Sequence, residues 1–214
     1  MKIHIIEKPI SYKEGLELQL QSREELASGK HYGEIFILQH DPPVITVGRN
    51  RGVKELKISE TELLKRGYDY FQVDRGGSIT VHEPGQIVIY IVAPVKSKNA
   101  GEFISEFMKP AGLCLFDEYR QKVVYDEKRP GLWLNNKKVA SVGLDLRGGI
   151  SMHGMAINVN NSLEGFQLVN PCGMESSIIS SLKNETDISF DLMEMKYKLE
   201  YYFTNHFECE DKIK

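Results

Sequence analysis

The segment Ile87–Ala93 constrains the fold of this 214-residue chain more than any other stretch. Its residues are all apolar or aromatic, most of them are β-branched, and Tyr90 stands in the middle. A short uninterrupted run of this kind is typical of a strand that is buried on both faces. We therefore expect it to be a central strand of a sheet.

Other segments supply the partners of this strand. Further strands are expected at residues 35–38, 44–47, 69–73, 132–134, 138–146 and 150–159. Asn135-Asn136 and Arg147-Gly148-Gly149 have the composition of the turns that join the last three of these as hairpins. Because hairpins dominate, the sequence predicts an α+β protein with a mixed or antiparallel sheet.

Four helices are expected around the sheet. Residues 11–28 begin with the capping box formed by Ser11 and Glu14, and Ser59 begins a second, short helix that ends by Gly67. A third helix begins at Asn99, and Pro110 predicts that it kinks or restarts there. The fourth is marked by the apolar and aromatic residues Phe190, Met193, Tyr197 and Tyr201.

Composition excludes several classes of protein. With 41% hydrophobic and 27% charged residues, the chain can form one folded domain over residues 1–214. Its net charge of −3 argues against nucleic-acid binding. No secretory signal and no run of about 18 apolar residues are present, so a cytoplasmic enzyme without a membrane span is expected.

Cys172 is the first candidate for chemistry. It stands between Pro171 and Gly173, late in the chain, in a setting that suits a thiol displayed on a loop. A lone cysteine is also typical of a small, inert, buried residue. Cys114 and Cys209 show no metal-ligand spacing with it, so no disulfide framework or metal site is predicted.

Lys138 is the second candidate. Strict strand alternation places it on one face with Ala140, Val142, Leu144 and Leu146. The lysine either extends its amine to water or keeps it enclosed, and an enclosed amine has a lowered pKa and can act as a base near neutral pH. Such an amine beside Cys172 would favour the thiolate, which makes the two residues a nucleophile and its base.

A glycine pair and three histidines add weaker signals. Arg75-Gly76-Gly77 is either a hairpin turn or a backbone loop that approaches a ligand, and it lacks the lysine that a phosphate-binding loop requires. His40, His82 and His153 are widely spaced, and each alone is more often structural than a ligand. We therefore expect no metal.

Four ordered blocks then resemble one known family. They are Arg75-Gly76-Gly77-x-x-Thr80-x-His82-x-Pro84-Gly85-Gln86, Lys138-Val139-Ala140-Ser141-Val142-Gly143, His153-Gly154-x-Ala156-x-Asn158-Val159 and Asn170-Pro171-Cys172-Gly173. Together they are similar to the lipoyl(octanoyl) transferases of lipoate biosynthesis, and the likeness covers nearly the whole chain. Any one block alone would be weak evidence.

The resemblance implies the fold of the biotin and lipoate protein ligases, with a mixed sheet flanked by helices. It implies an acyltransferase that takes an octanoyl group from octanoyl-acyl carrier protein. The acceptors would be a lysine of the lipoyl domains of 2-oxoacid dehydrogenase complexes, or of the glycine cleavage H protein. No cofactor, nucleotide or metal is expected, because the thioester already stores the activation energy, and neither nucleic acid nor membrane is an expected partner.

The resemblance also implies the site. The cysteine matching Cys172 carries the acyl group as a thioester, and the lysine matching Lys138 assists it as general base and acid. Three further segments would line the acyl site: Arg75, Gly76, Gly77, Ser78, Ile79, Thr80, Val81 and His82, then Ser141, Val142 and Gly143, and then Gly154, Met155 and Ala156. Val142 and Leu144 are expected to line an apolar groove for the octanoyl chain.

Two residues depart from the family pattern. Position 83 is Glu where the family has Gly, and position 81 is Val where an aromatic residue is usual. Glu83 either raises the pKa of the neighbouring His82 through its charge or points into solvent. The departures put the chain-length preference in doubt.

Two rival functions stay open. An ATP-dependent lipoate or biotin ligase shares the fold but activates a free acid and needs no cysteine nucleophile. The other rival is a non-catalytic module that binds carrier proteins. Acidic carrier partners would dock on a local basic patch, for which there are two candidates: Lys54, Lys57, Lys65 and Arg66, or Arg120, Lys122, Lys128 and Arg129.

Overall fold

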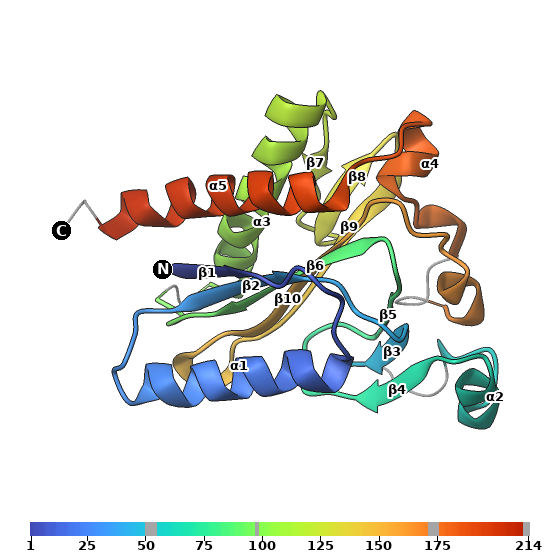
Figure 1. The fold of residues 1–214 in the computed structure, drawn as a ribbon, viewed down its shortest axis with the longest axis horizontal. Helices are drawn as coiled ribbons and strands as arrows, with labels where there is room; N and C mark the ends of the chain where they lie inside the picture. The colour runs from blue at the N-terminus through green and yellow to red at the C-terminus, as the bar shows by residue number, and fades with distance from the viewer. Residues whose placement is uncertain (50–54, 97–98, 171–175, 212–214) are drawn as a thin grey trace.

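The computed structural model describes residues 1–49, 55–96, 99–170 and 176–211, except for the side chains of 176 and 208–211. Two sheets and two long-helix layers make up the fold (Figure 1). The fold class predicted from the sequence, a mixed sheet flanked by helices, is therefore confirmed.

The larger sheet has the strand order β1-β2-β6-β10-β9-β8-β7. The strands are β1 (Lys2–Ile5), β2 (Glu34–Leu38), β6 (Gln86–Val92), β7 (Val124–Tyr125), β8 (Gly131–Leu134), β9 (Lys137–Asp145) and β10 (Met152–Asn158). Only β1 and β2 pair in parallel, and the other neighbours are antiparallel. The expected central strand is β6, which lies between β2 and β10 and is buried along its whole length.

The smaller sheet has the order β4-β3-β5. Its strands are β3 (Val44–Val47), β4 (Asp69–Gln72) and β5 (Ile79–His82). It has an apolar core of its own, which includes Ile45, Val81 and Phe166. Figure 1 places this sheet beside the beginning of the first helix, with the short α2 (Glu60–Lys65) at its outer end.

The two faces of the larger sheet are covered by different helices (Figure 1). On one face, α1 (Tyr12–Ala27) packs its Leu18 and Leu26 against β2 and β6. On the other face, α3 (Ala100–Tyr119) and α5 (Leu192–Asp211) contribute to the main apolar core. The remaining helical segments are short: Arg147–Gly149, Gly165–Leu168, Ser176–Ile178 and α4 (Leu182–Thr186).

The local signals behave as expected at the predicted helix starts and at the hairpin turn. The Ser11 hydroxyl accepts the backbone N–H of Glu14 at 3.2 Å, and the Glu14 carboxylate accepts the N–H of Ser11 at 2.8 Å, which confirms the capping box. Asn135 and Asn136 both have positive φ, 50° and 63°, as the tight turn between β8 and β9 requires.

Of the two outcomes predicted at Pro110, a kink or a restart, the restart is wrong, because α3 continues through this residue. A proline inside a helix removes one backbone hydrogen bond and crowds the preceding turn. Here Phe107, Ala111 and Leu115 are fully buried on either side of Pro110. Their packing into the main core outweighs the local cost.

Candidate active site

A cavity lies between the two sheets, on the face of the larger sheet that α1 also covers. Strands β6, β9 and β10 form its floor, and β3, β5 and the loop before β5 form its roof. Most of the residues predicted to bind substrate line it: Arg75, Gly77, Ser78, Ile79, Thr80, His82, Ser141, Val142, Gly143, Gly154, Met155 and Ala156. Lys138 lines the same cavity, so segments far apart in the sequence meet there.

Gly76 and Val81 do not line the cavity. Val81 is fully buried in the core of the smaller sheet, because strand alternation turns it away from Thr80 and His82. The N–H of Gly76 donates to the Leu144 carbonyl at 2.9 Å, so Gly76 joins the roof loop to the edge of the floor.

Several lining residues were not expected from the sequence: Tyr12, Thr46, Val88, Tyr90, His153, Phe166 and Ile179. Tyr90 and Val88 face the cavity because they alternate with the core residues Ile87, Ile89 and Ile91 of the same strand. The sequence does not show which face of β6 borders the cavity, and only the pairing of β6 with β10 reveals it. For His153 the sequence did offer a signal, because it begins the motif that contains the predicted residues Gly154, Met155 and Ala156.

Lys138 is buried, with a relative exposure of 8%. The prediction that it shares a face with Ala140, Val142 and Leu144 is wrong. The pairing of β8 with β9 shifts register between Leu132 and Trp133, so Lys138 pairs with Trp133 whereas Ala140 pairs with Leu132. The extra residue in β9 turns Lys138 to the cavity, on the side of Ser141 and Gly143, and Leu144 packs in the main core instead.

Strand β8 shapes the space around the Lys138 side chain. A Cβ placed on Gly131 would lie 2.4 Å from Lys138 Cε and 2.4 Å from the Ala140 carbonyl oxygen, so only glycine fits there. The Lys138 ammonium lies 5.8 Å from the centroid of the Trp133 ring, which favours a cation at that point. The amine is therefore enclosed, which is one of the two alternatives that the sequence left open.

Arg75 ties the roof together from within. This buried guanidinium donates to the Thr46 carbonyl and hydroxyl at 2.8 Å each, and to the Gly76 carbonyl at 3.0 Å. Thr46 is itself fully buried in β3. Arg75 thus joins the loop before β5 to the middle strand of the smaller sheet and brings a fixed positive charge to the cavity wall.

The cavity histidines are held neutral. Burial lowers the pKa of His82 to about 3 and the pKa of His153 to about 4, and in both cases the charge of Arg75 lowers it further. His40, behind the cavity wall, has a pKa lowered by burial to about 4, and its Nε2 lies 2.7 Å from the Tyr90 hydroxyl. None of these rings carries a charge at neutral pH.

Both expectations for Glu83 are wrong. Its side chain is buried, and its carboxylate accepts the backbone N–H groups of Leu163 at 2.7 Å and Gly165 at 3.1 Å, and the Asn161 side chain at 3.0 Å. The pKa of His82 is lowered rather than raised. Glu83 is an anchor for the loop that leads to Phe166.

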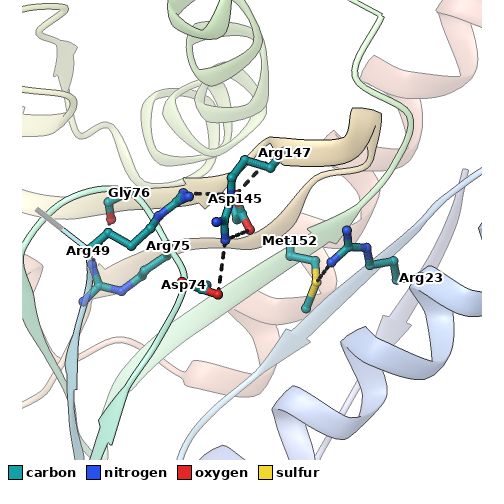
Figure 2. Close-up of polar contacts among 8 residues, drawn as sticks. All are labelled: Arg23, Arg49, Asp74, Arg75, Gly76, Asp145, Arg147 and Met152. Atoms are coloured by element: carbon teal, nitrogen blue, oxygen red, sulfur yellow. Dashed lines mark hydrogen bonds and ion pairs between the residues drawn. The ribbon is translucent and has the colours of Figure 1, made fainter.

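An ionic cluster adjoins the cavity at the far end of β9 (Figure 2). The carboxylate of Asp145 lies 3.0 Å from Arg49 Nη2 and 2.9 Å from Arg147 Nε, and Arg147 also reaches Asp74 at 3.3 Å. Burial raises the pKa of Asp145, but the hydrogen bonds and charges of Arg147 and Arg49 outweigh this effect and lower it overall. The cluster fastens the roof loop to the floor strand.

Cys172 lies outside the described residues. The chain on either side of it is described: the N–H of Asn170 donates to the Glu55 carbonyl at 2.8 Å, and Ile179 forms a bridge with Lys138 and lines the cavity. Glu55 in turn accepts a hydrogen bond from the Ser78 hydroxyl. Cys114, by contrast, is fully buried, and burial raises the pKa of its thiol to about 12.

Neither a cluster of metal ligands nor a membrane-spanning helix occurs among the described residues. Among the described side chains, in 1–49, 55–96, 99–170 and 177–207, no three of the metal-ligating kinds come together. In the part of the chain that the structure describes, no helix combines the length and the apolar character that crossing a bilayer would demand.

Comparison with known sequences identifies relatives over most of the chain. Residues 11–204 match the family model of the lipoyl protein ligase A/B catalytic domain. The chain is 34% identical over 176 residues to an octanoyltransferase of Desulfotalea psychrophila, a match that covers 80% of this chain and 78% of the relative. It is 33% identical over 197 residues to the octanoyltransferase of Caldicellulosiruptor saccharolyticus, covering 91% and 83%.

Comparison with solved structures supports the fold. Lipoate-protein ligase A bound with ATP superimposes with a TM-score of 0.73 at 13% identity, covering 97% of this chain and 85% of that one. The biotin protein ligase of Aquifex aeolicus, in complex with biotin and ATP, gives 0.55 at 14% identity, covering 97% and 71%. These likenesses concern the fold alone, whereas the sequence matches are to acyltransferases. The chain therefore belongs to the octanoyltransferases, enzymes of the lipoyl protein ligase A/B catalytic family.

Proposed function

We propose that this enzyme moves an octanoyl group from octanoyl-acyl carrier protein to a specific lysine of lipoyl domains, through a thioester on Cys172. The lipoyl domains of 2-oxoacid dehydrogenase complexes and the glycine cleavage H protein are the proposed acceptors. The observation that carries the proposal is the enclosed Lys138 amine. The amine lies in a cavity that is lined also by Ile179. In the sequence, Ile179 follows Cys172 by only a few residues.

Acyl-enzyme formation is the first proposed half of the reaction. Lys138 takes the thiol proton of Cys172, and the thiolate attacks the octanoyl carbonyl carbon of the carrier thioester. The carbonyl re-forms as the bond to the carrier sulfur breaks, and that sulfur leaves as the carrier thiol with the proton from Lys138. One thioester replaces another, so no nucleotide or other source of energy is needed.

Transfer to the acceptor is the second half. The lysine amine of the lipoyl domain attacks the thioester carbonyl carbon of the acyl-enzyme. Lys138 accepts a proton from the attacking nitrogen, the Cys172 sulfur leaves, and an amide remains on the acceptor. Returning the proton to the sulfur restores the resting enzyme.

The walls of the cavity suit an aliphatic chain. Val88 and Ala156 provide apolar side chains on the cavity face of the floor, and Ile79, Phe166 and Ile179 lie opposite or beside them. Val142 and Met155 also line the cavity, although they pack against the main core as well. Burying each methylene of an acyl chain contributes about 0.8 kcal/mol. An octanoyl chain can therefore be held by its tail alone, while the polar groups act on the thioester end.

Carrier docking is proposed on the basic group that includes Arg129. The Arg129 guanidinium lies 4.0 Å above the Trp133 ring, the same ring that lies 5.8 Å from the Lys138 ammonium. Arg129, which is also paired with Asp126, thereby links this group of Arg120, Lys122, Lys128 and Arg129 to the surroundings of the catalytic lysine. No such link is described for the other candidate patch, in which Lys54 lies outside the described residues and Arg66 is paired with Glu62 on α2.

The deciding experiment is intact-mass spectrometry of the protein mixed with octanoyl-acyl carrier protein. We expect one octanoyl adduct on the wild type and none on Cys172→Ala. Cys114→Ala is the matched control and should keep the adduct, because that thiol is buried and its pKa is raised to about 12. Lys138→Met should form the adduct about 100-fold to 10,000-fold more slowly, the usual contribution of a positioned base.

A second arm separates transfer from ligation. The protein is incubated with octanoic acid, ATP and a lipoyl domain, but without carrier protein. The proposal predicts an unmodified lipoyl domain in this arm and an octanoylated one when octanoyl-carrier is supplied. Efficient modification with acid and ATP would instead establish a ligase.

A further inference from the structure

Gln86 and Asn158 stand in two of the sequence motifs, but their own side chains do not line the cavity. Both are almost fully buried, with relative exposures of 1% and 2%, and they lie opposite each other on β6 and β10. Buried amides are costly unless each donor and acceptor finds a partner. Their partners reveal a directed chain of hydrogen bonds.

The chain begins at a backbone carbonyl. The Asn158 side-chain nitrogen donates to the Ser180 carbonyl at 3.1 Å, and a carbonyl can only accept, so the Asn158 Oδ1 must face the other way. That oxygen accepts from Gln86 Nε2 at 2.8 Å. Gln86 Nε2 also donates to the Val81 carbonyl at 3.1 Å, so the direction of both amides is fixed.

The chain ends at His82. Gln86 Oε1 lies 2.7 Å from His82 Nδ1, and because this oxygen only accepts, Nδ1 must carry the proton. A neutral imidazole has one proton, so Nε2 keeps a bare lone pair. The ring lines the cavity, and Nε2 has no hydrogen-bond partner among the residues that the structure describes.

The same chain is joined to the catalytic lysine. The N–H of Ser180 donates to the carbonyl of Lys138 at 3.0 Å, so the residue that sets the direction of the amides also binds the strand of the lysine. His82 and Lys138 therefore belong to one connected frame, with His82 on the roof and Lys138 on the floor. Their relative position is therefore set by hydrogen bonds among buried residues, Ser180 included.

The charged groups of the cavity wall suggest what the acceptor atom His82 Nε2 contributes. Arg75 and Lys138 present only hydrogen-bond donors when they are charged. A substrate group that itself brings N–H donors needs an acceptor, and His82 Nε2 is one fixed in direction. Its acceptor character persists at working pH, because burial holds the pKa of His82 at about 3.

We infer that His82 Nε2 accepts a hydrogen bond from the primary amine of the acceptor lysine and orients it for attack, with Gln86 and Asn158 as the positioning residues that impose this tautomer. The inference rests on the proposed function, since it assigns a residue to its second half-reaction. The first half needs no such acceptor, because the carrier thioester brings no N–H to the reacting carbon.

The test measures the two half-reactions separately in single turnovers. His82→Phe keeps a ring in the cavity without the acceptor, and Gln86→Met keeps the volume without the amide. Gln86→Met, whose side chain lies outside the cavity, should form the octanoyl-enzyme within about threefold of the wild-type rate. In both variants, transfer of the octanoyl group to the lipoyl domain should slow about tenfold more than formation of the octanoyl-enzyme does, which is the loss expected for one hydrogen bond. Equal slowing of both halves, or of neither, would overturn the inference.

Asn160→Asp is the matched control. Asn160 carries an amide too, two residues after the end of β10. It bonds the backbone of Phe190 and takes no part in the hydrogen bonds from Ser180 to His82. Its half-reactions should match the wild type. If the wild type forms no octanoyl-enzyme at all, the proposed function fails, and this outcome is distinct from a failure of the His82 assignment.

A direct measurement of the tautomer needs no activity assay. Nitrogen-15 NMR of the wild type, labelled at histidine and assigned by loss of one signal in His82→Phe, reports which ring nitrogen carries the proton. We expect a protonated Nδ1 and a bare Nε2 from pH 5 to pH 8. A proton on Nε2 would contradict the inference even if every variant were active.

Discussion

The floor and the roof of the cavity are held by different forces. The floor belongs to the larger sheet, where β6, β9 and β10 are fixed by a main core of fully buried apolar side chains that includes Ile89 and Ile157. The roof belongs to the smaller sheet, which has a small apolar core of its own and depends in addition on buried polar side chains. Arg75 bonds Thr46 and Ser78 bonds Glu55 within this region, Arg49 bonds Asp145 of the floor, and Glu83 bonds the loop around Leu163.

This difference in forces predicts that the floor and the roof contribute differently to stability and to activity. Apolar packing is non-directional, so the floor is stable but selects little by itself. Buried polar groups lose free energy when they miss their partners, so they permit only one arrangement of the roof. We expect changes in the roof to cost mainly stability and changes in the floor near Lys138 to cost mainly activity.

The largest effect is expected from Arg75→Met, which breaks the roof at its centre. The variant leaves the buried carbonyl and hydroxyl of Thr46 without the guanidinium that now binds them. Hydrogen bonds to a charged group contribute about 1.5–3 kcal/mol each, so we expect a loss of about 4 kcal/mol in the free energy of unfolding. Urea denaturation measures it, and Arg66→Met, which removes an exposed ion pair on α2, should change it by less than about 1 kcal/mol. If Arg75→Met also lost less than about 1 kcal/mol, the stability of the roof would not depend on its buried polar side chains, and the contrast with the apolar floor would fail.

Gly131→Ala tests the floor. The added methyl would overlap Lys138 Cε and the Ala140 carbonyl, and the φ of +157° is itself one that side chains rarely adopt. Because the lysine must leave its position, we expect the rate of octanoyl-enzyme formation to fall about 100-fold. The control is Gly112→Ala on α3, where the added methyl meets neighbours only at 3.8 Å. Full activity in Gly131→Ala would show that the position of Lys138 does not depend on β8.

The sequence predicts the floor well because its signals are local. Apolar runs gave the central strand, the β9–β10 hairpin and the helices, and the motifs named most of the residues that the cavity gathers. The exception is the face of Lys138. Alternation fails there because β9 carries one extra residue relative to β8, and pairing between strands cannot be counted within a single strand.

The roof is harder to predict because its partners are distant in the chain. Glu83 binds groups about eighty residues away, and Gln86 meets Asn158 across 72 residues. Nothing near Glu83 in the sequence distinguishes a buried anchor from a charged surface residue. Tyr12 precedes all four motifs and Phe166 lies between the third and the fourth, so their part in the site depends on the fold.

Glu83→Gln sharpens the comparison with a smaller change in the roof. The carboxylate accepts three donors, whereas an amide offers one acceptor and turns its own donors toward the others. We expect a loss of about 2 kcal/mol in the free energy of unfolding, together with a raised KM for the octanoyl donor, because the anchored loop carries Phe166 into the cavity. Glu164→Gln changes an exposed residue of the same loop and should leave both quantities unaltered. An unchanged stability in Glu83→Gln would mean that the loop holds itself in place.

The smallest effect concerns His40, which supports the junction of floor and roof. It lies 5.5 Å from the Tyr12 ring and 5.6 Å from the His82 ring, and Tyr90 bonds its Nε2. Its pKa is lowered from 6.5 to about 4, so between these values the unfolded chain binds a proton that the folded chain does not. Stability is therefore complete above about pH 6.5 and declines as the pH falls toward 4, by at most about 1.4 kcal/mol per pH unit.

His40→Gln removes the contribution of this imidazole to the pH dependence of the free energy of unfolding. It keeps a side chain that can accept a hydrogen bond from the Tyr90 hydroxyl. Urea unfolding at intervals from pH 7.5 to pH 4.5 should show a shallower decline than in the wild type, although His82 and His153 still contribute their own share, because burial lowers their pKa values to about 3 and about 4. Above pH 6.5 the two curves should run parallel, which serves as the internal control. Parallel curves over the whole range would mean that folding does not lower the pKa of His40. The folded chain would then bind this proton below about pH 6.5, and there the Tyr90 hydroxyl would lose its acceptor.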